Sequence, residues 1–130
     1  MKDSIQQHSF LVFGAGVSGR AAYALLSKLG AKAKLIEGDG PDQIEEYDIL
    51  ILSPGISREH QLVQKFIKQN KKVWAEVELA SRFINSPILG ITGSNGKTTV
   101  CMMMHDFLQR LGKKSFLAGN IGTPLSEVAM

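Results

Sequence analysis

The sequence is poor in the features that mark secreted and membrane proteins. It has one cysteine, Cys101, so no disulfide can form within the chain, and a reducing compartment such as the cytoplasm suits it. No apolar run approaches the roughly 18 residues of a membrane-spanning helix. Residues 1–8 lack the apolar core of a signal peptide. We therefore expect a cytoplasmic protein that does not insert into a membrane.

Clusters of charge and of metal ligands are also scarce. The net charge is +3, and Lys and Arg are scattered along the chain. The small group of Lys68, Lys71 and Lys72 is typical of a solvated helix end rather than of a nucleic-acid site. None of the three histidines has a companion at the spacing of zinc ligands. We expect no nucleic-acid partner and no zinc site.

The N-terminal part contains a dinucleotide-type glycine motif. The apolar run 9–13 predicts a buried strand and leads into Gly14–Gly19, which reads G-x-G-x-x-G. A helical pattern follows and stops at Gly30, and residues 32–36 predict a second strand. Glu37 ends that strand. In dinucleotide-binding domains an acidic residue about 20 residues after the glycine motif binds a ribose, and Glu37 lies near that position. It could also be a solvated strand-end carboxylate, but the order of elements predicts a Rossmann-type unit.

A third predicted strand brings another glycine to the same edge. Residues 48–52 form an apolar run, and the loop 53–57 (S-P-G-I-S) follows it. Ligands bind outside the carboxyl ends of parallel strands, so Gly55 would face the same crevice as Gly16. The alternative is a plain Pro-Gly turn.

The remaining elements complete this first unit. Ser57 is a candidate cap for the next helix, residues 72–74 predict a short strand, and residues 76–83 predict a short helix. Residues 84–87 then read as a linker. We therefore expect a first domain over residues 1–85.

A second phosphate-binding motif follows. The apolar run 88–91 predicts a strand, residues 93–96 (G-S-N-G) predict a turn, and a helical pattern begins after it. Backbone N–H groups of such a turn hold phosphate, Lys97 reaches the outer phosphates, and Thr98 is placed to bind Mg²⁺. The first glycine of the general pattern G-x-x-x-x-G-K-[ST] would fall at Ile91, so the general motif is matched imperfectly.

The helix after this loop is predicted to be amphipathic and to stop at Gly112. We expect its apolar stripe, methionines included, to pack in a core. Residues 114–117 predict another strand, and residues 119–124 form a second glycine loop that either lines the phosphate crevice or is an ordinary turn. Thr123 is a candidate cap for a last helix. The stripe consists of Val100, Met103, Met104, Phe107, Leu108 and Leu111.

Four of these motifs, in this order, resemble those of the Mur ligases of peptidoglycan synthesis. They are Gly14–Gly19, Ser53–Ile56, Ile91–Thr99 and Gly119–Gly122, and residues 76–79 (E-V-E-L) fit as well. The third motif is characteristic of the family and accounts for the misplaced first glycine. The resemblance spans all 130 residues, and they match the N-terminal third or so of the D-glutamate-adding members.

The resemblance implies an α/β fold with two parts. A Rossmann-like parallel-sheet domain at 1–85 would bind a uridine nucleotide, and 86–130 would begin a central P-loop ATPase domain. The implied reaction is the ATP- and Mg²⁺-dependent addition of D-glutamate to UDP-N-acetylmuramoyl-L-alanine through an acyl phosphate, in the bacterial cytoplasm. We expect a monomer. The family's other metal ligands, its carbamylated lysine and its D-glutamate site have no counterpart here, so we expect a fragment that is inactive alone.

By motif position, the resemblance also implies two sets of site residues. The uridine substrate would contact Val17, Ser18, Glu37, Gly55 and Asn120, although the family often has Asp at the position of Glu37. Lys97 would be catalytic, stabilising charge on the transferred phosphoryl group, and Thr98 would bind the metal. The ATP-binding set is Gly93, Ser94, Asn95, Gly96, Lys97, Thr98 and Thr99.

Two other functions stay open at this point. An NAD(P)-dependent oxidoreductase would explain residues 9–37 equally well but leaves the second phosphate loop unexplained. A nucleotide-binding regulatory module would need no catalytic machinery at all.

Overall fold

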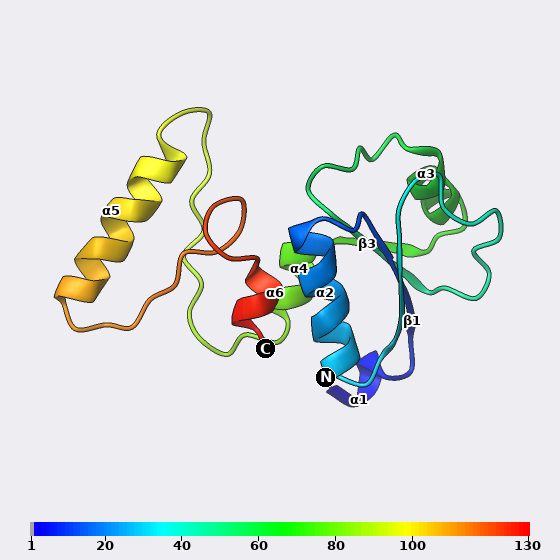
Figure 1. Ribbon diagram of the computed structural model, residues 1–130, viewed down its shortest axis with the longest axis horizontal. Coiled ribbons are helices and arrows are strands. Elements are labelled where there is room, and N and C mark those ends of the chain that lie inside the picture. The colour runs from blue at the N-terminus through cyan, green and yellow to red at the C-terminus, as the bar shows by residue number, and fades with distance from the viewer. Residues whose placement is uncertain (1) are drawn as a thin grey trace.

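The computed structural model describes residues 2–130 and shows an α/β protein built on a four-stranded parallel sheet (Figure 1). The strands lie in the order β2-β1-β3-β4. The strands β2 and β3 therefore lie on opposite sides of β1. In open α/β sheets, ligands bind at the point where the strand order reverses in this way. The strands are β1 (Ser9–Phe13), β2 (Lys32–Ile36), β3 (Ile49–Leu52) and β4 (Lys72–Ala75).

Six helices accompany the sheet among the described residues. None of them is long and apolar enough to cross a membrane. The predicted boundaries of β1 and β2 are confirmed. The first long helix stops at Gly30 as predicted, where φ is 75°, but it begins at Val17, within the glycine motif rather than after it. The helices are α1 (Lys2–Ile5), α2 (Val17–Lys28), α3 (Gln61–Lys68), α4 (Glu76–Ser81), α5 (Lys97–Arg110) and α6 (Leu125–Val128).

The two central strands, β1 and β3, are buried on both faces, as continuous apolar runs predict. Alternate residues of each strand point to opposite faces. Phe10 and Val12 face one cluster, which includes Leu25 and Leu26 of α2. Leu11 faces the other cluster, which contains residues of α3. Helices on both sides therefore enclose the sheet and leave the carboxyl ends of its strands as its accessible edge.

Two local predictions in this unit were wrong. The cap of α3 is His60, whose Nδ1 accepts a hydrogen bond from Leu62 N at 3.2 Å. Ser57 instead closes a turn just before it, where its Oγ accepts from Glu59 N. The helix after β4, predicted over residues 76–83, is shorter and ends at Ser81.

Neither of the two strands predicted after residue 87 forms in the described chain. Residues 88–91 are irregular, and residues 114–117 contain no strand. A strand needs a neighbour whose backbone groups it can pair with, and neither segment lies along an edge of the sheet. The phosphate loop is therefore followed by the predicted helix but is not preceded by the predicted strand.

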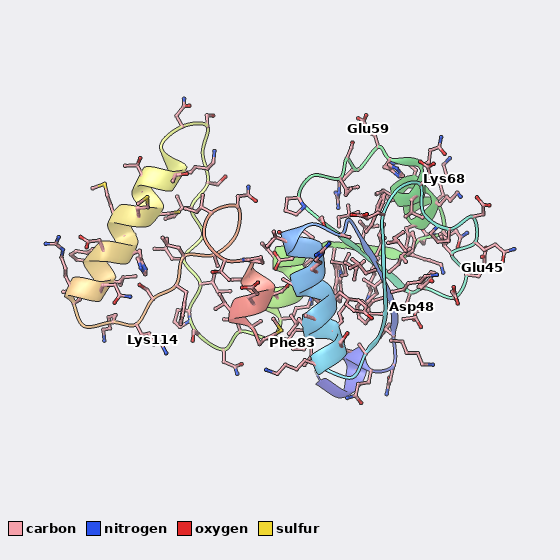
Figure 2. The ribbon with its side chains drawn as sticks, in the orientation of Figure 1. Glu45, Asp48, Glu59, Lys68, Phe83 and Lys114 are labelled. Carbon is pink, nitrogen blue, oxygen red and sulfur yellow. The ribbon has the colours of Figure 1, made fainter. Side chains whose placement is uncertain are left out.

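Helix α5 forms as predicted but packs differently. None of its residues, all of which the structure describes, is buried. The expected core positions Met103 and Phe107 are 66% and 56% exposed. Figure 1 shows α5 standing apart from the sheet, and Figure 2 shows its side chains extending on all sides. The expectation that the stripe fills a core is wrong for this chain.

Lys71 secures the turn that leads into β3. Its Nζ donates to the carbonyl oxygens of Ile44 at 2.8 Å and Tyr47 at 2.5 Å. A longer contact, 3.3 Å, reaches Glu45 O. Ile44 and Tyr47 are buried in the α3-side cluster. The ammonium group thus reinforces a turn in which Ile44 O also accepts from Tyr47 N at 3.0 Å.

We expect Lys71→Met to lower the free energy of unfolding by about 1–3 kcal/mol, because a charged donor is removed while the aliphatic chain is kept. Lys68→Met is the matched control. Lys68 is an exposed residue of α3 (Figure 2), and its substitution should change the value by less than about 0.5 kcal/mol. Urea denaturation followed by circular dichroism measures both. Equal effects of the two substitutions would contradict this role of Lys71.

Candidate nucleotide-binding cleft

A cleft of about 1090 Å³ lies at the carboxyl edge of the sheet. Four chain segments line it. Three of them follow β1, β2 and β3 directly, and the fourth comes from residues 119–124, far along the chain. The cleft therefore sits where the strand order reverses, the usual place for a ligand in an open α/β sheet.

The turn after β1 is held by very close packing. A Cβ atom at Gly19 would lie 1.7 Å from the carbonyl oxygen of Gly14, which leaves no room for any side chain. Ser53, at the end of β3, donates its hydroxyl to the same carbonyl oxygen at 2.9 Å. Gly16 differs, because a Cβ there would meet nothing within 4 Å. The first and third glycines of the motif therefore shape the turn, and the second faces open space in the cleft.

The first turn of α2 supplies hydrogen-bond donors to the cleft. Gly16 caps the helix without a side-chain hydrogen bond, and the first turn contains no acidic residue. Val17 and Ser18 both line the cleft. The N–H groups of a first helical turn have no partner within the helix, and they carry partial positive charge. This end of the cleft is built to accept an anion.

The charge of the cleft comes from few side chains. No Lys or Arg is among the described residues that line it, and its ionisable side chains are those of Glu37 and His60. Glu37 follows β2, as predicted, and is exposed. A diphosphate would therefore be held by backbone N–H groups rather than by basic side chains.

Sequence reasoning missed His60 as part of this cleft. The histidine was considered only as a metal ligand and set aside. In the structure it lines the cleft, caps α3 and packs edge-on against Phe13, with ring centroids 4.8 Å apart. Because Nδ1 accepts a backbone hydrogen bond, the neutral ring carries its proton on Nε2. Its position in the loop that follows Gly55 was the available signal.

The loop 119–123 reaches the cleft from outside the first predicted domain. Gly119, Asn120 and Gly122 line it. The loop is closed by hydrogen bonds from Gly119 N to Thr123 O at 3.1 Å and from Thr123 N to Leu117 O at 3.3 Å. The helix α6 after it is capped by Pro124, one residue later than the predicted cap Thr123. The structure thus brings Asn120 to the crevice that the first three loops form.

All five residues predicted for the uridine substrate lie in this one cleft. Sequence motifs alone could not show that they converge, since Asn120 is separated from the others by α5. Their convergence is geometric, and their role in binding stays a prediction. The five are Val17, Ser18, Glu37, Gly55 and Asn120.

The predicted ATP loop lies elsewhere. Residues 93–99 do not line the cleft, and they are exposed. Gly96 caps α5 with a φ of 79° and without a side-chain hydrogen bond, so the first-turn N–H groups face solvent. Lys97 folds back over the loop and donates its Nζ to Gly93 O. Thr98 sits in the first turn beside it.

This loop fits a nucleotide phosphate better than it fits a metal ion alone. It offers N–H groups, one ammonium group and the hydroxyl of Thr98, but no carboxylate from residues 93–99. Among the side chains that the structure describes, no three from His, Cys, Asp or Glu gather where they could share a metal ion. A metal ion at Thr98 would therefore need the phosphates themselves as ligands.

Substitutions at two glycines separate the two roles within the first motif. We expect Gly19→Ala to lower the free energy of unfolding by about 3 kcal/mol or more, because its Cβ would overlap the Gly14 carbonyl. Gly16→Ala should change it by less than about 0.5 kcal/mol, because the φ of −72° and the open space both accept alanine. It should still weaken the binding of UDP, because the new methyl group projects into the cleft.

Urea denaturation and calorimetric titration with UDP measure these effects. A Gly16→Ala variant that is as unstable as Gly19→Ala would show that both glycines shape the turn. Unchanged UDP binding in Gly16→Ala would show that no ligand approaches the second glycine.

Comparison with known proteins relates this chain to one protein family. Residues 91–128 match the Mur ligase middle domain. The protein of Leuconostoc mesenteroides named UDP-N-acetylmuramoylalanine--D-glutamate ligase is 39% identical over 91% of this chain and 32% of its own length. Proteins of the same name from Streptococcus thermophilus and Salinibacter ruber are 38% and 32% identical over 96% and 98% of this chain.

This chain spans about a third of the length of those relatives. The family match begins at the phosphate loop and ends within α6, so it includes both the loop of Lys97 and the cleft residue Asn120. The relatives extend the similarity across the Rossmann-like sheet as well. On these grounds the chain belongs to the Mur ligase family.

Proposed function

We propose that this chain is part of an ATP-dependent ligase that adds D-glutamate to UDP-N-acetylmuramoyl-L-alanine in peptidoglycan precursor synthesis. The proposal takes its reaction from the relatives that carry this name. One observation in the structure supports it most strongly: loops from four separate segments, including that of Asn120, line one cleft. A chain that bound only a nicotinamide dinucleotide would not need the fourth segment.

The cleft has the properties that a uridine diphosphate sugar requires. In the proposed complex the diphosphate lies over the first turn of α2, where Val17 and Ser18 offer N–H groups. Glu37 lies at the uridine end, and Gly55 and Asn120 approach the diphosphate and the sugar. Because no Lys or Arg is among the described lining residues, the diphosphate would be held by backbone N–H groups, and the sugar and base would supply the other contacts.

The phosphate loop is the proposed ATP site. Residues 93–99 supply N–H groups, Lys97 supplies a positive charge for the transferred phosphoryl group, and Thr98 supplies a hydroxyl ligand for Mg²⁺. Mg²⁺ neutralises charge on the phosphates when it is bound. In the structure the Lys97 ammonium already lies across the loop, so it needs only to exchange a carbonyl partner for a phosphate oxygen.

The proposed reaction has two steps. The carboxylate of the alanyl group accepts the γ-phosphoryl group, which gives an acyl phosphate and ADP. The amino nitrogen of D-glutamate then attacks the acyl carbon, an amide bond forms, and inorganic phosphate leaves. Residues 1–85 serve the uridine substrate together with the loop of Asn120, and residues 86–130 begin the ATP-binding part, with the boundary near residues 84–87. The bacterial cytoplasm, where ATP is available, is the proposed location.

Titration of the chain with three ligands tests the proposal. We expect heat of binding with UDP-N-acetylmuramoyl-L-alanine, no displacement of it by NADH, and separate binding of ADP with Mg²⁺. Guanosine diphosphate is the control for unspecific binding of a diphosphate at the α2 N-terminus. Tight binding of NADH with no response to the uridine nucleotide would favour an oxidoreductase and reject the ligase.

The two nucleotide sites should also respond separately to substitution. We expect Lys97→Ala to weaken ADP–Mg²⁺ binding at least about tenfold, because a charge-assisted contact to phosphate is lost. The uridine nucleotide should bind as before, because Lys97 does not line the cleft. Lys113→Ala, at an exposed position after α5, is the matched control and should change neither affinity. An equal loss of both ligands in Lys97→Ala would argue against two separate sites.

A further inference from the structure

Helix α6 is fastened to the sheet unit by a buried carboxylate. Glu76, the first residue of α4, is only 2% exposed, and its Oε1 accepts a hydrogen bond from Ser126 N at 2.6 Å. Ser126 lies in the first turn of α6 and is fully buried. A carboxylate at this position satisfies an N–H group that the helix cannot satisfy itself, and it complements the positive end of the helix.

This bond is the polar centre of a larger contact. Leu125 of α6 and Ala129, which caps it, pack against the core cluster that contains Leu25 of α2 and Leu79 of α4. Lys28 of α2 also donates its Nζ to the carbonyl oxygen of Met130. Figure 1 shows α6 beside α4 and α2, on the same side of the sheet. The short helix is therefore held by the first unit rather than by α5.

The cleft depends on where α6 is held. The loop 119–123 enters the helix directly through Pro124, and both the loop and Pro124 line the cleft. On its other side the loop continues into residues 111–118, which form no helix or strand and lead back to the exposed helix α5. Of the two ends of the loop, only the α6 end is anchored in a core.

We propose that Glu76 is a positioning residue for the nucleotide cleft: by capping α6 it holds the loop of Asn120 against the other three loops. Glu76 does not line the cleft, so it would act through Ser126 and α6 rather than by contact with a ligand. The proposal rests on the proposed function for the identity of the ligand, but the docking of α6 by Glu76 is independent of it. The carboxylate acts on the diphosphate and sugar end, where Asn120 lies, and not on the uridine end at Glu37.

Three variants test this role. Glu76→Ala removes the acceptor, Glu76→Gln keeps an acceptor oxygen without the charge, and Glu78→Ala is the matched control. Glu78 lies on the same helix but is exposed, and its partner Arg82 is an exposed residue at 3.0 Å. Two measurements are made on each: hydrogen exchange of the amides of residues 119–126 in the free chain, and the affinities for UDP-N-acetylmuramoyl-L-alanine and for UMP.

We expect Glu76→Ala to speed exchange at residues 119–126 while the amides of β1 and β3 stay protected. Its affinity for UDP-N-acetylmuramoyl-L-alanine should fall at least about tenfold, since only the docked fraction binds the ligand fully. Its affinity for UMP should stay within about twofold. Glu76→Gln should retain most of both properties, because a neutral acceptor keeps part of the hydrogen bond, and Glu78→Ala should match the wild type.

The outcomes that overturn the proposal are distinct from a failure of the proposed function. Unchanged exchange at residues 119–126 in Glu76→Ala would show that the carboxylate does not hold the loop. An equal loss of affinity for both ligands, or faster exchange throughout the sheet, would show a general effect on stability instead of positioning. If the wild type bound neither ligand, the proposed function would fail, and the exchange data would still decide the docking role.

Discussion

The arrangement of the loops at the carboxyl edge of the sheet depends on how closely α2 packs against the turn that precedes it. The helix comes so near that a methyl group at Gly19 would overlap the Gly14 carbonyl oxygen. Ser53 from β3 donates to that same oxygen, so one carbonyl group links β1, α2 and β3. Because this contact fixes the first turn of α2 beside the ends of β1 and β3, the N–H groups of the helix face the crevice where the strand order reverses.

The first domain was largely predictable because its signals are local. Two of its four strands match their predicted bounds, and the apolar runs of β1 and β3 explain why both are buried on two faces. What failed depends on distant partners. Residues 88–91 have the composition of a strand, but a strand forms only beside another one. The stripe of α5 is correctly periodic, yet periodicity does not say what will cover it.

The candidate sites were likewise predictable only where their signals are local. Glycine spacing located the turn of Gly16 and the loop of Lys97, since each motif lies within a few residues. The cleft as a whole could not be read from one motif, because the loop of Asn120 reaches it from beyond α5. His60 and Glu76 were missed for a related reason. Each is a single polar residue at the start of an ordinary helix, His60 as the cap of α3 and Glu76 as the first residue of α4, and only its three-dimensional neighbours give it a role.

Glu76 also shows how the two parts of the chain are physically connected. Burying a carboxylate costs free energy unless it is hydrogen-bonded, and the bond to Ser126 N at 2.6 Å meets that requirement. The partner lies beyond the phosphate loop, so the sheet unit and the loop of Asn120 are joined by packing as well as by sequence. Helix α5 has no buried residue, and short helices without tertiary packing are marginal in water. The position of the Asn120 loop in the cleft is therefore determined by α6, which packs against the same sheet unit that carries the other three loops.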